Sequence, residues 1–191
     1  MDPLAKLFGS PARLKLLRLF LFNDDMAFTA ADTAFRTRTP KDAVRKELSV
    51  LVGSGIIRKK PGKEATYATE KKSLHYEALK VFVRTTTDLS DAYIGTALKK
   101  AGAMKLIVLS GLFTGALESK VDVLVVGDSI DEKVLATSIH SLEAELGREL
   151  RYASFSTEQF RYRLGVYDRL LRDVFDFPNR VIIDKLGVTS K

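Results

Sequence analysis

The sequence predicts an α+β protein with two domains, residues 1–84 and residues 85–191. Helix-start signals and helically spaced apolar residues fill most of the first domain, and a short basic hairpin follows them. Apolar strand-like runs then alternate with helical segments, which is typical of a small α/β domain with a mixed sheet. The charge divides at the same place: residues 1–85 contain 17 Lys and Arg against 9 Asp and Glu, whereas residues 86–191 contain 14 against 15.

Composition excludes several classes of protein. A length of 191 residues with 46% hydrophobic content suffices for one sizeable domain or two small ones, each with a buried core. The absence of cysteine excludes disulfides, thiolate nucleophiles and Cys-based zinc sites. No apolar run approaches the roughly 20 residues that span a bilayer, and cations interrupt the apolar positions of residues 4–22, unlike a secretory signal. We therefore expect a cytoplasmic protein.

Two helix starts open the first domain. Ser10 before Pro11 supplies a capping hydroxyl and a proline at the first helical position, so we expect a helix that ends near Asn23. Thr29 can cap a second, shorter helix that includes Phe35.

A third helix is predicted from the signal Thr39-Pro40 to about Gly53. Its sequence has an apolar face and a polar face at helical spacing. The apolar face contains Val44, Leu48 and Leu51, and the polar face contains Lys41, Arg45 and Ser49.

A hairpin follows this helix. Pro61-Gly62 fits the centre of a type II turn, so residues 58–60 and 65–69 should form two paired strands. After the hairpin, residues 70–84 carry apolar side chains at helical spacing, which predicts a helix that either forms a dimer surface or packs only on its own domain. The run from Thr85 to Asp88 ends that pattern and marks the domain boundary.

The excess positive charge is concentrated in one short segment. Residues 35–72 alone contain 11 basic and 4 acidic side chains. A patch of this kind favours a polyanionic partner, because each phosphate that it neutralises releases counterions. The alternative is a basic face that is merely solvated.

Three short helices followed by a basic hairpin resemble the winged helix-turn-helix of transcription regulators. The string LFGSPARLKLLRLFL is similar to the first helix of the ArsR-like branch, and VRKELSVLVGSGIIRKK is similar to its recognition helix and the start of its wing. The resemblance covers about residues 4–70. It implies a homodimeric regulator that binds double-stranded DNA, with the third helix in the major groove.

The resemblance also assigns contacts to individual residues. Arg45 is the candidate for a base contact, because a guanidinium can pair bidentately with guanine. The remaining candidates on and before the recognition helix and on the wing contact bases or phosphates, although some would be solvated cations only. They are Arg36, Arg38, Thr39, Lys41, Lys46, Ser49, Lys59, Lys60 and Lys63. Metal-sensing members of the branch use Cys or His clusters, whereas this chain has only the distant His75 and His140, so we expect no metal.

The second domain is expected to contain a small mixed sheet with helices on one side. A helix is expected over 89–100, followed by strands over 104–109 and 121–126. Ser129 and Glu132 form a capping box that begins the next helix, which ends at Gly147. A strand over 149–155, a second capping box at Ser156 and Gln159, a helix over 166–176 and a strand over 180–183 complete the domain. The aromatic and basic run 155–167 fits helix core better than a nucleic-acid stacking surface.

The segment LIVLSGLFTGALESKVDVLVVGD, residues 106–128, resembles the catalytic core of small nucleotidyltransferases. That family needs a Gly-Ser turn and an Asp-x-Asp pair that binds magnesium together with a carboxylate on the next strand. Here the turn is Ser110-Gly111, and Lys120 stands in place of the first aspartate before Asp122. An ammonium group repels a divalent cation and donates no lone pair. On the next strand Glu149 is the only carboxylate.

These departures predict a pseudoenzyme that needs no cofactor. Its altered site either binds a nucleotide phosphate or serves only for dimerisation or protein contact. The residues for phosphate binding would be Ser110, Gly111, Thr114, Gly115, Lys120 and Asp122. The alternatives are an active enzyme, with Mg²⁺ and nucleotide, whose winged helix recruits a protein or nucleic-acid substrate, and an adaptor in which both domains bind protein.

Overall fold

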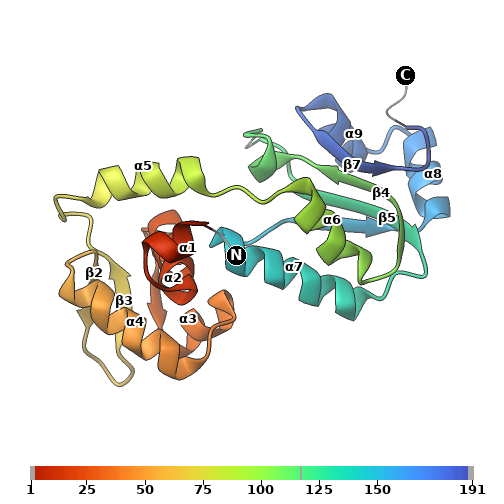
Figure 1. The fold of residues 1–191 in the computed structure, drawn as a ribbon. Coiled ribbons are helices and arrows are strands. Elements are labelled where there is room, and N and C mark those ends of the chain that lie inside the picture. The colour runs from red at the N-terminus through yellow and green to blue at the C-terminus, as the bar shows by residue number, and fades with distance from the viewer. Residues whose placement is uncertain (1–2, 117, 189–191) are drawn as a thin grey trace. The chain divides into compact units, whose positions relative to one another are not determined.

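The computed structural model describes residues 3–116 and 118–188 and shows a mixed α+β chain. Residues 117 and 189–191 of the predicted second domain lie outside the described residues. The chain divides into two units, which we describe separately. Unit 1 comprises Met1–Leu89 with His140–Arg148, and unit 2 comprises Ser90–Ile139 with Glu149–Lys191. Figure 1 shows the order of the elements along the chain.

Unit 1 is built from helices on a three-stranded antiparallel sheet. Its elements are α1 (Pro3–Leu7), α2 (Pro11–Phe22), β1 (Ala27–Thr29), α3 (Ala30–Thr37), α4 (Lys41–Gly53), β2 (Ile57–Lys60), β3 (Thr66–Thr69) and α5 (Tyr76–Thr86). The strand order is β1-β3-β2. The core joins α2, α4, the sheet and α5 through Leu17, Phe20, Leu48, Ile57 and Val83.

The first two predicted helix starts are confirmed. The Ser10 hydroxyl accepts the N–H of Arg13 at 3.2 Å, and α2 ends before Asn23 as expected. Thr29 forms a full capping box with Asp32, in which each side chain accepts the backbone N–H of the other residue. Both caps satisfy N–H groups that the first helical turn leaves without partners.

Three predictions in unit 1 are wrong in detail. Thr39 does not cap α4, because its hydroxyl donates to the carbonyl of Thr37 at 3.2 Å and Pro40 is the N-cap residue. The hairpin does not have a type II turn: Gly62 lacks the positive φ that this turn requires, and five residues separate the paired Lys60 and Thr66. The predicted helix over 70–84 begins only at Tyr76.

Unit 2 is built on a four-stranded mixed sheet of order β6-β5-β4-β7. Its elements are α6 (Asp91–Lys99), β4 (Ala103–Leu109), the 3-10 turn η1 (Gly111–Phe113), β5 (Val123–Asp128), α7 (Glu132–Leu146), β6 (Tyr152–Phe155), α8 (Thr157–Gly165), α9 (Arg169–Asp176) and β7 (Arg180–Asp184). Strands β5 and β6 are parallel, and the other pairs are antiparallel. The last residues of α7, from His140, belong to unit 1.

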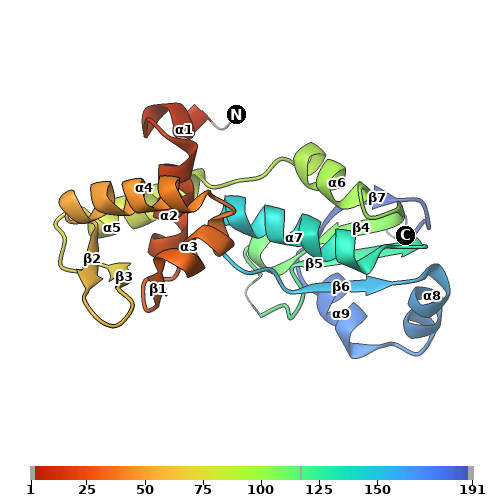
Figure 2. The same ribbon diagram turned by 90° about the horizontal axis from the view of Figure 1, so that it is seen from below.

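Helices cover both faces of this sheet, contrary to the prediction of helices on one side. Val181 packs with the cluster that α8 and α9 form against β4 and β5. The next residue, Ile182, lies against Gly95 of α6. Because neighbouring residues of a strand point to opposite faces, α6 lies on the face opposite α8 and α9, as Figure 2 shows.

Capping in unit 2 follows the prediction at one site and departs from it at another. Ser156 and Gln159 form the expected capping box of α8. Ser129 does not cap α7; instead the Asp131 carboxylate accepts the N–H groups of Lys133 and Val134 at 2.9 and 3.0 Å.

Within the described residues, no helix is both long enough and apolar enough to cross a membrane.

Candidate nucleic-acid interface and the Asp122 site

Helix α4 separates its apolar and basic side chains onto opposite faces. Val44, Leu48 and Leu51 are buried against the core of unit 1. The exposed face carries the polar side chains Lys41, Asp42, Arg45, Lys46 and Ser49. The helix is therefore held by one face and presents three cations and one carboxylate on the other.

The second acidic residue of α4 is directed away from this exposed face. Glu47 is 5% exposed and accepts a hydrogen bond from Nε of Arg13 at 2.8 Å. Its negative charge is thus compensated inside unit 1. Asp42, by contrast, is fully solvated and lies 3.4 Å from the Arg45 guanidinium, a surface pair that contributes little to stability.

The hairpin carries the remaining exposed cations of the predicted interface. In β2 only Ile57 is buried, and the three following residues Arg58, Lys59 and Lys60 are exposed. Lys63 is exposed in the connection to β3. Arg58 was not among the predicted contact residues, although the same basic run contains it.

Three of the ten predicted DNA-binding residues are engaged within unit 1. The Arg36 guanidinium lies 5.3 Å from the centre of the Phe28 ring. Arg38 takes a left-handed backbone conformation with φ 49° at the end of α3, and its Nη1 donates to Ser141 Oγ at 2.5 Å. Thr39 is half-buried and hydrogen-bonded to Thr37. The other seven residues are exposed.

The two histidines are not brought together by the fold. His140 stacks on Phe35 with ring centres 4.7 Å apart, and its Nε2 lies 3.0 Å from the Phe35 carbonyl oxygen. His75 is exposed before α5. Across the described ranges, no group of three or more His, Asp or Glu side chains is arranged to hold a metal ion.

In unit 2, the Asp122 carboxylate is enclosed by four N–H donors. Its Oδ1 accepts from the Leu112 backbone and from Nη2 of Arg151, both at 2.8 Å. Its Oδ2 accepts from the Arg151 backbone at 2.9 Å and from Nε of Arg151 at 3.0 Å. Because four donors occupy the two oxygens, this carboxylate offers no free lone pair to a metal ion.

Arg151 also sets the protonation state of Asp122. Burial alone would raise the pKa of Asp122, which is 2% exposed. Hydrogen bonds from the Arg151 side chain and backbone and from the Leu112 N–H outweigh burial, so the pKa lies below its ordinary value. The same carboxylate raises the pKa of the Arg151 guanidinium. At neutral pH the pair is therefore a charged, bidentate ion pair.

Gly111 allows the turn to close over this pair. Its φ is 49°, and a Cβ built there would lie 2.2 Å from Oδ1 of Asp122 and 3.2 Å from Nη2 of Arg151. Only glycine fits both the left-handed backbone and the close approach. The Ser-Gly order of this turn is thus suited to covering the ion pair.

The six residues predicted for phosphate binding separate into two groups. Ser110 is buried with its hydroxyl 3.2 Å from Ser119 Oγ, and the Thr114 hydroxyl donates to the Pro178 carbonyl at 2.8 Å. With Gly111 and Asp122 they form one hydrogen-bonded region. Gly115 and Lys120 are exposed outside it, and Lys120 has no hydrogen bond or ion pair with the described part of the chain.

The role of Arg151 was missed by sequence reasoning. The contact follows from the parallel pairing of β5 with β6. Val123 pairs with Tyr152, so the residues that precede them, Asp122 and Arg151, meet.

Comparison of the chain with protein-family models, with curated proteins and with solved structures finds no match.

Proposed function

We propose that the chain is a DNA-binding transcription regulator whose first domain is a winged helix. In this proposal α2, α3 and α4 form the helical part, α4 is the recognition helix, and β2 and β3 form the wing. The observation that carries it is the solvated basic face of α4, which lies opposite its buried apolar face.

The side chains on this face suit the two kinds of DNA contact. Arg45 has a side-chain exposure of 71% and only a weak 3.4 Å contact with Asp42, so its fork of donors is available to a guanine edge. Lys41 and Lys46 flank it and can reach phosphates. Lys59, Lys60 and Lys63 add cations from the wing, where they contribute affinity without reading sequence.

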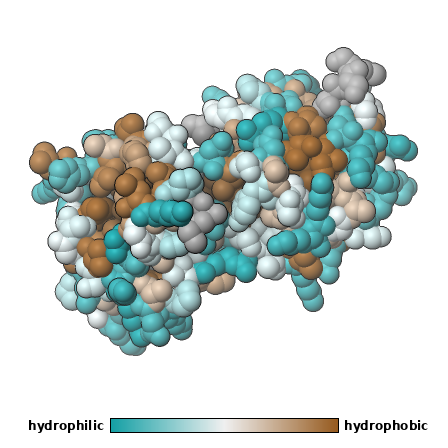
Figure 3. Space-filling view, in the orientation of Figure 1, coloured by the Kyte–Doolittle hydropathy of each residue, from teal (hydrophilic) through white to brown (hydrophobic). Residues whose placement is uncertain are grey.

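We further propose a homodimer in the cytoplasm. Two recognition helices in a dimer would contact two half-sites. Apolar side chains support an interface around α5: Leu7, Leu74 and Val81 are 72%, 91% and 57% exposed. Figure 3 shows hydrophobic side chains gathered on this face of unit 1 over α1 and α5.

We propose that the second domain is a nucleotidyltransferase-like scaffold without transfer activity. Two-metal transfer needs carboxylate oxygens that are free to bind Mg²⁺. Asp122, the aspartate that the family pattern retains, instead gives both oxygens to Arg151 and backbone N–H groups. This domain serves dimerisation or the binding of a partner or ligand.

The recognition-helix assignment predicts distinct effects of two sets of substitutions on DNA binding. Duplexes selected from a random library by the full chain would be titrated by fluorescence anisotropy between about 50 and 200 mM salt. Arg45→Ala should weaken binding to the selected duplex about tenfold or more. The same variant should bind a scrambled duplex almost as tightly as the parent chain does. The double substitution Lys59→Ala, Lys60→Ala should weaken both duplexes and lower the salt slope by about 2.

Matched controls are two exposed lysines of unit 2, Lys99 and Lys133. Replacing either by alanine removes one positive charge without touching the proposed interface, and should leave the selectivity for the selected duplex unchanged. The assignment is wrong if these controls weaken specific binding as much as Arg45→Ala does. A magnesium-dependent transfer of labelled nucleotide that Asp122→Ala abolishes would contradict the proposal that the second domain has no transfer activity.

A further inference from the structure

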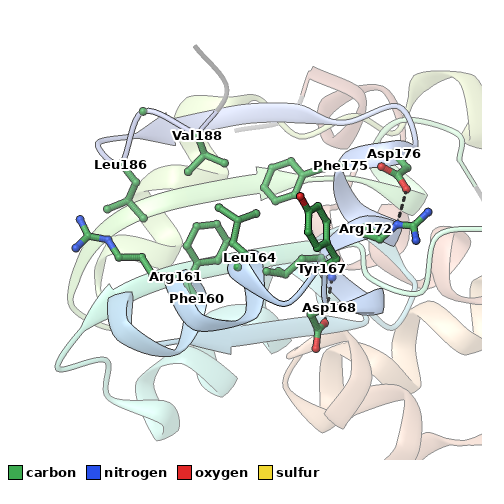
Figure 4. A pocket seen from close by; sticks show the side chains of 13 residues that line it. Phe160, Arg161, Leu164, Tyr167, Asp168, Arg172, Phe175, Asp176, Leu186 and Val188 are labelled. Atoms are coloured by element: carbon green, nitrogen blue, oxygen red, sulfur yellow. Dashed lines mark hydrogen bonds and ion pairs between the residues drawn. The ribbon is translucent and has the colours of Figure 1, made fainter. Parts of the chain in front are cut away.

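A concave pocket of unit 2 lies between α8, α9 and the segment after β7. Its volume is about 620 Å³, within the range of pockets that hold small molecules. Phe160 and Leu171 form its floor and are 1% and 2% exposed, so they are fixed by the sheet beneath. Leu164, Phe175 and Val188 line its sides. Figure 4 shows Phe160, Leu164, Phe175 and Val188 gathered around the pocket.

Two apolar side chains that line this pocket are exposed to solvent, Leu164 and Tyr167, with exposures of 42% and 81%. Tyr162 and Val166 of the same run, residues 155–167, are 71% and 55% exposed but do not line the pocket. An exposed apolar surface that is also concave is typical of a ligand site rather than of ordinary surface. The predicted helix core in this run is therefore confirmed only for Phe160.

Tyr167 adds an observation of a different kind. It lies between α8 and α9 with φ 52°, a left-handed conformation that is unfavourable for a non-glycine residue because its Cβ comes too close to the backbone carbonyl. Tyr167 is 81% exposed, so burial of its ring does not compensate for this cost. Figure 4 shows the ring at the pocket, beside Leu164 and Phe175. A strained backbone at an aromatic residue that lines a pocket points to a role of that residue in binding.

The charges around the pocket leave one cation uncompensated. Arg172 pairs with Asp176 at 3.3 Å. Asp168 caps α9 by accepting the N–H of Leu170 at 2.9 Å and pairs with Arg163 at 2.7 Å. Arg161, in contrast, has no acidic partner among the described residues. Figure 4 places Arg161 near Leu186, at the end of the pocket opposite Arg172 and Asp176.

We propose that this pocket binds a small amphipathic anion, an aromatic molecule with one carboxylate or similar acid group. The aromatic body lies on Phe160 against Leu164, Phe175 and Tyr167, and the acid group faces Arg161. A nucleotide fits less well, because its several phosphate charges would meet a single free guanidinium. The inference concerns ligand binding to unit 2 and does not depend on the DNA-binding proposal.

The test uses two fluorescent probes that share one aromatic body. 8-Anilinonaphthalene-1-sulfonate carries one sulfonate, and N-phenyl-1-naphthylamine is the same body without it. Each is titrated into the full-length protein under native conditions. We expect saturable binding of both probes at one site, and tighter binding of the sulfonate.

Three variants separate the parts of the proposal. Leu164→Trp fills the pocket from a partly exposed position and should weaken both probes about tenfold. Tyr167→Gly removes the ring while relieving the left-handed backbone, so the fold is kept and both probes should weaken. Arg161→Gln should weaken the sulfonate about fivefold, as expected for a partly solvated ion pair, and leave the neutral probe unchanged.

The matched control is Arg169→Gln, which removes an exposed arginine of α9 that does not line the pocket. It should leave both probes unchanged, and near-ultraviolet circular dichroism of each variant verifies that the fold is intact. The proposal is overturned if Leu164→Trp folds and binds both probes as the parent chain does. It is also overturned if Arg161→Gln and Arg169→Gln weaken the sulfonate equally, because general surface charge would then explain the binding.

Discussion

Replacing Gly147 by alanine is expected to destabilise unit 1 by about 4 kcal/mol, the sum of a left-handed backbone penalty and overpacking. Gly147 has φ 72°, and an added Cβ would lie 2.6 Å from the carbonyl carbon of Arg18 and 2.7 Å from the backbone nitrogen of Leu19. Both neighbours are backbone atoms of α2, so neither can rotate away. The helix or the residues after α7 must shift instead.

The surrounding hydrogen bonds make such a shift costly. Arg18 is 2% exposed, and its guanidinium donates to the Glu145 carbonyl and to the Thr87 hydroxyl, each at 3.0 Å. Asn23 Nδ2 donates to the Gly147 carbonyl at 2.8 Å. These donors satisfy carbonyls that the end of a helix leaves open. A displaced backbone would leave a buried guanidinium without its acceptors.

Gly55→Ala is the matched control in the same unit. Gly55 has φ 70°, and an added Cβ would have no atom within 4 Å. This substitution therefore carries the backbone penalty alone, about 1–2 kcal/mol. Hydrogen exchange of the α2 amides measures both variants, because it reports the opening of unit 1 separately from unit 2. Equal losses for the two variants would show that the contact with α2 does not constrain Gly147.

Asp122→Ala is the second substitution with a large expected effect, a loss of about 3 kcal/mol from unit 2. The substitution leaves the N–H groups of Leu112 and Arg151 without their acceptor beneath the turn. It also removes the bidentate partner of the Arg151 guanidinium, half of which is solvated and can recover water. Hydrogen exchange of β5 and β6 measures the loss.

The acid dependence of stability should change with the same substitution. The pKa of Asp122 is lowered in the folded state, so its contribution is present above the ordinary pKa of 3.8. That contribution is lost as the pH falls through the folded-state pKa. Asp122→Ala should therefore flatten the acid decline in the stability of unit 2.

Asp128→Ala provides the control for this second prediction. Asp128 lies at the other end of β5, is exposed, and pairs with Lys105 at the surface. Its removal should destabilise unit 2 much less than that of Asp122, because water can replace its contacts. If the two substitutions cost the same, the enclosure of Asp122 by four donors would not be the source of its effect.

Local sequence signals predicted those features that depend on neighbouring residues. Ser10, Thr29 and Ser156 cap their helices as expected, because each needs only a backbone N–H two or three residues away. The apolar spacing of α4 likewise predicted its buried face, and therefore which of its cations are exposed. The basic candidate interface could be predicted for this reason.

Local signals failed where a neighbouring residue took the predicted capping position, or where pairing and packing with distant segments decide the structure. Thr39 and Ser129 match capping patterns, yet Pro40 and Asp131 occupy those positions. Strand β1 was not predicted, since three residues carry little pattern and are ordered by pairing with β3. The helices on both faces of the second sheet were also not predicted, because chain order does not determine the face to which each helix returns.

The sequence by itself determined the two-part α+β organisation, the concentration of positive charge in residues 35–72 and the placement of Lys120 two residues before Asp122. Only the tertiary structure decided what Asp122 does. The parallel pairing of β5 and β6 brings Arg151 to it across 28 intervening residues, and Gly111 lets the turn close over both. The same is true of the pocket between α8 and α9, since its shape depends on how two helices and the segment after β7 pack on one sheet.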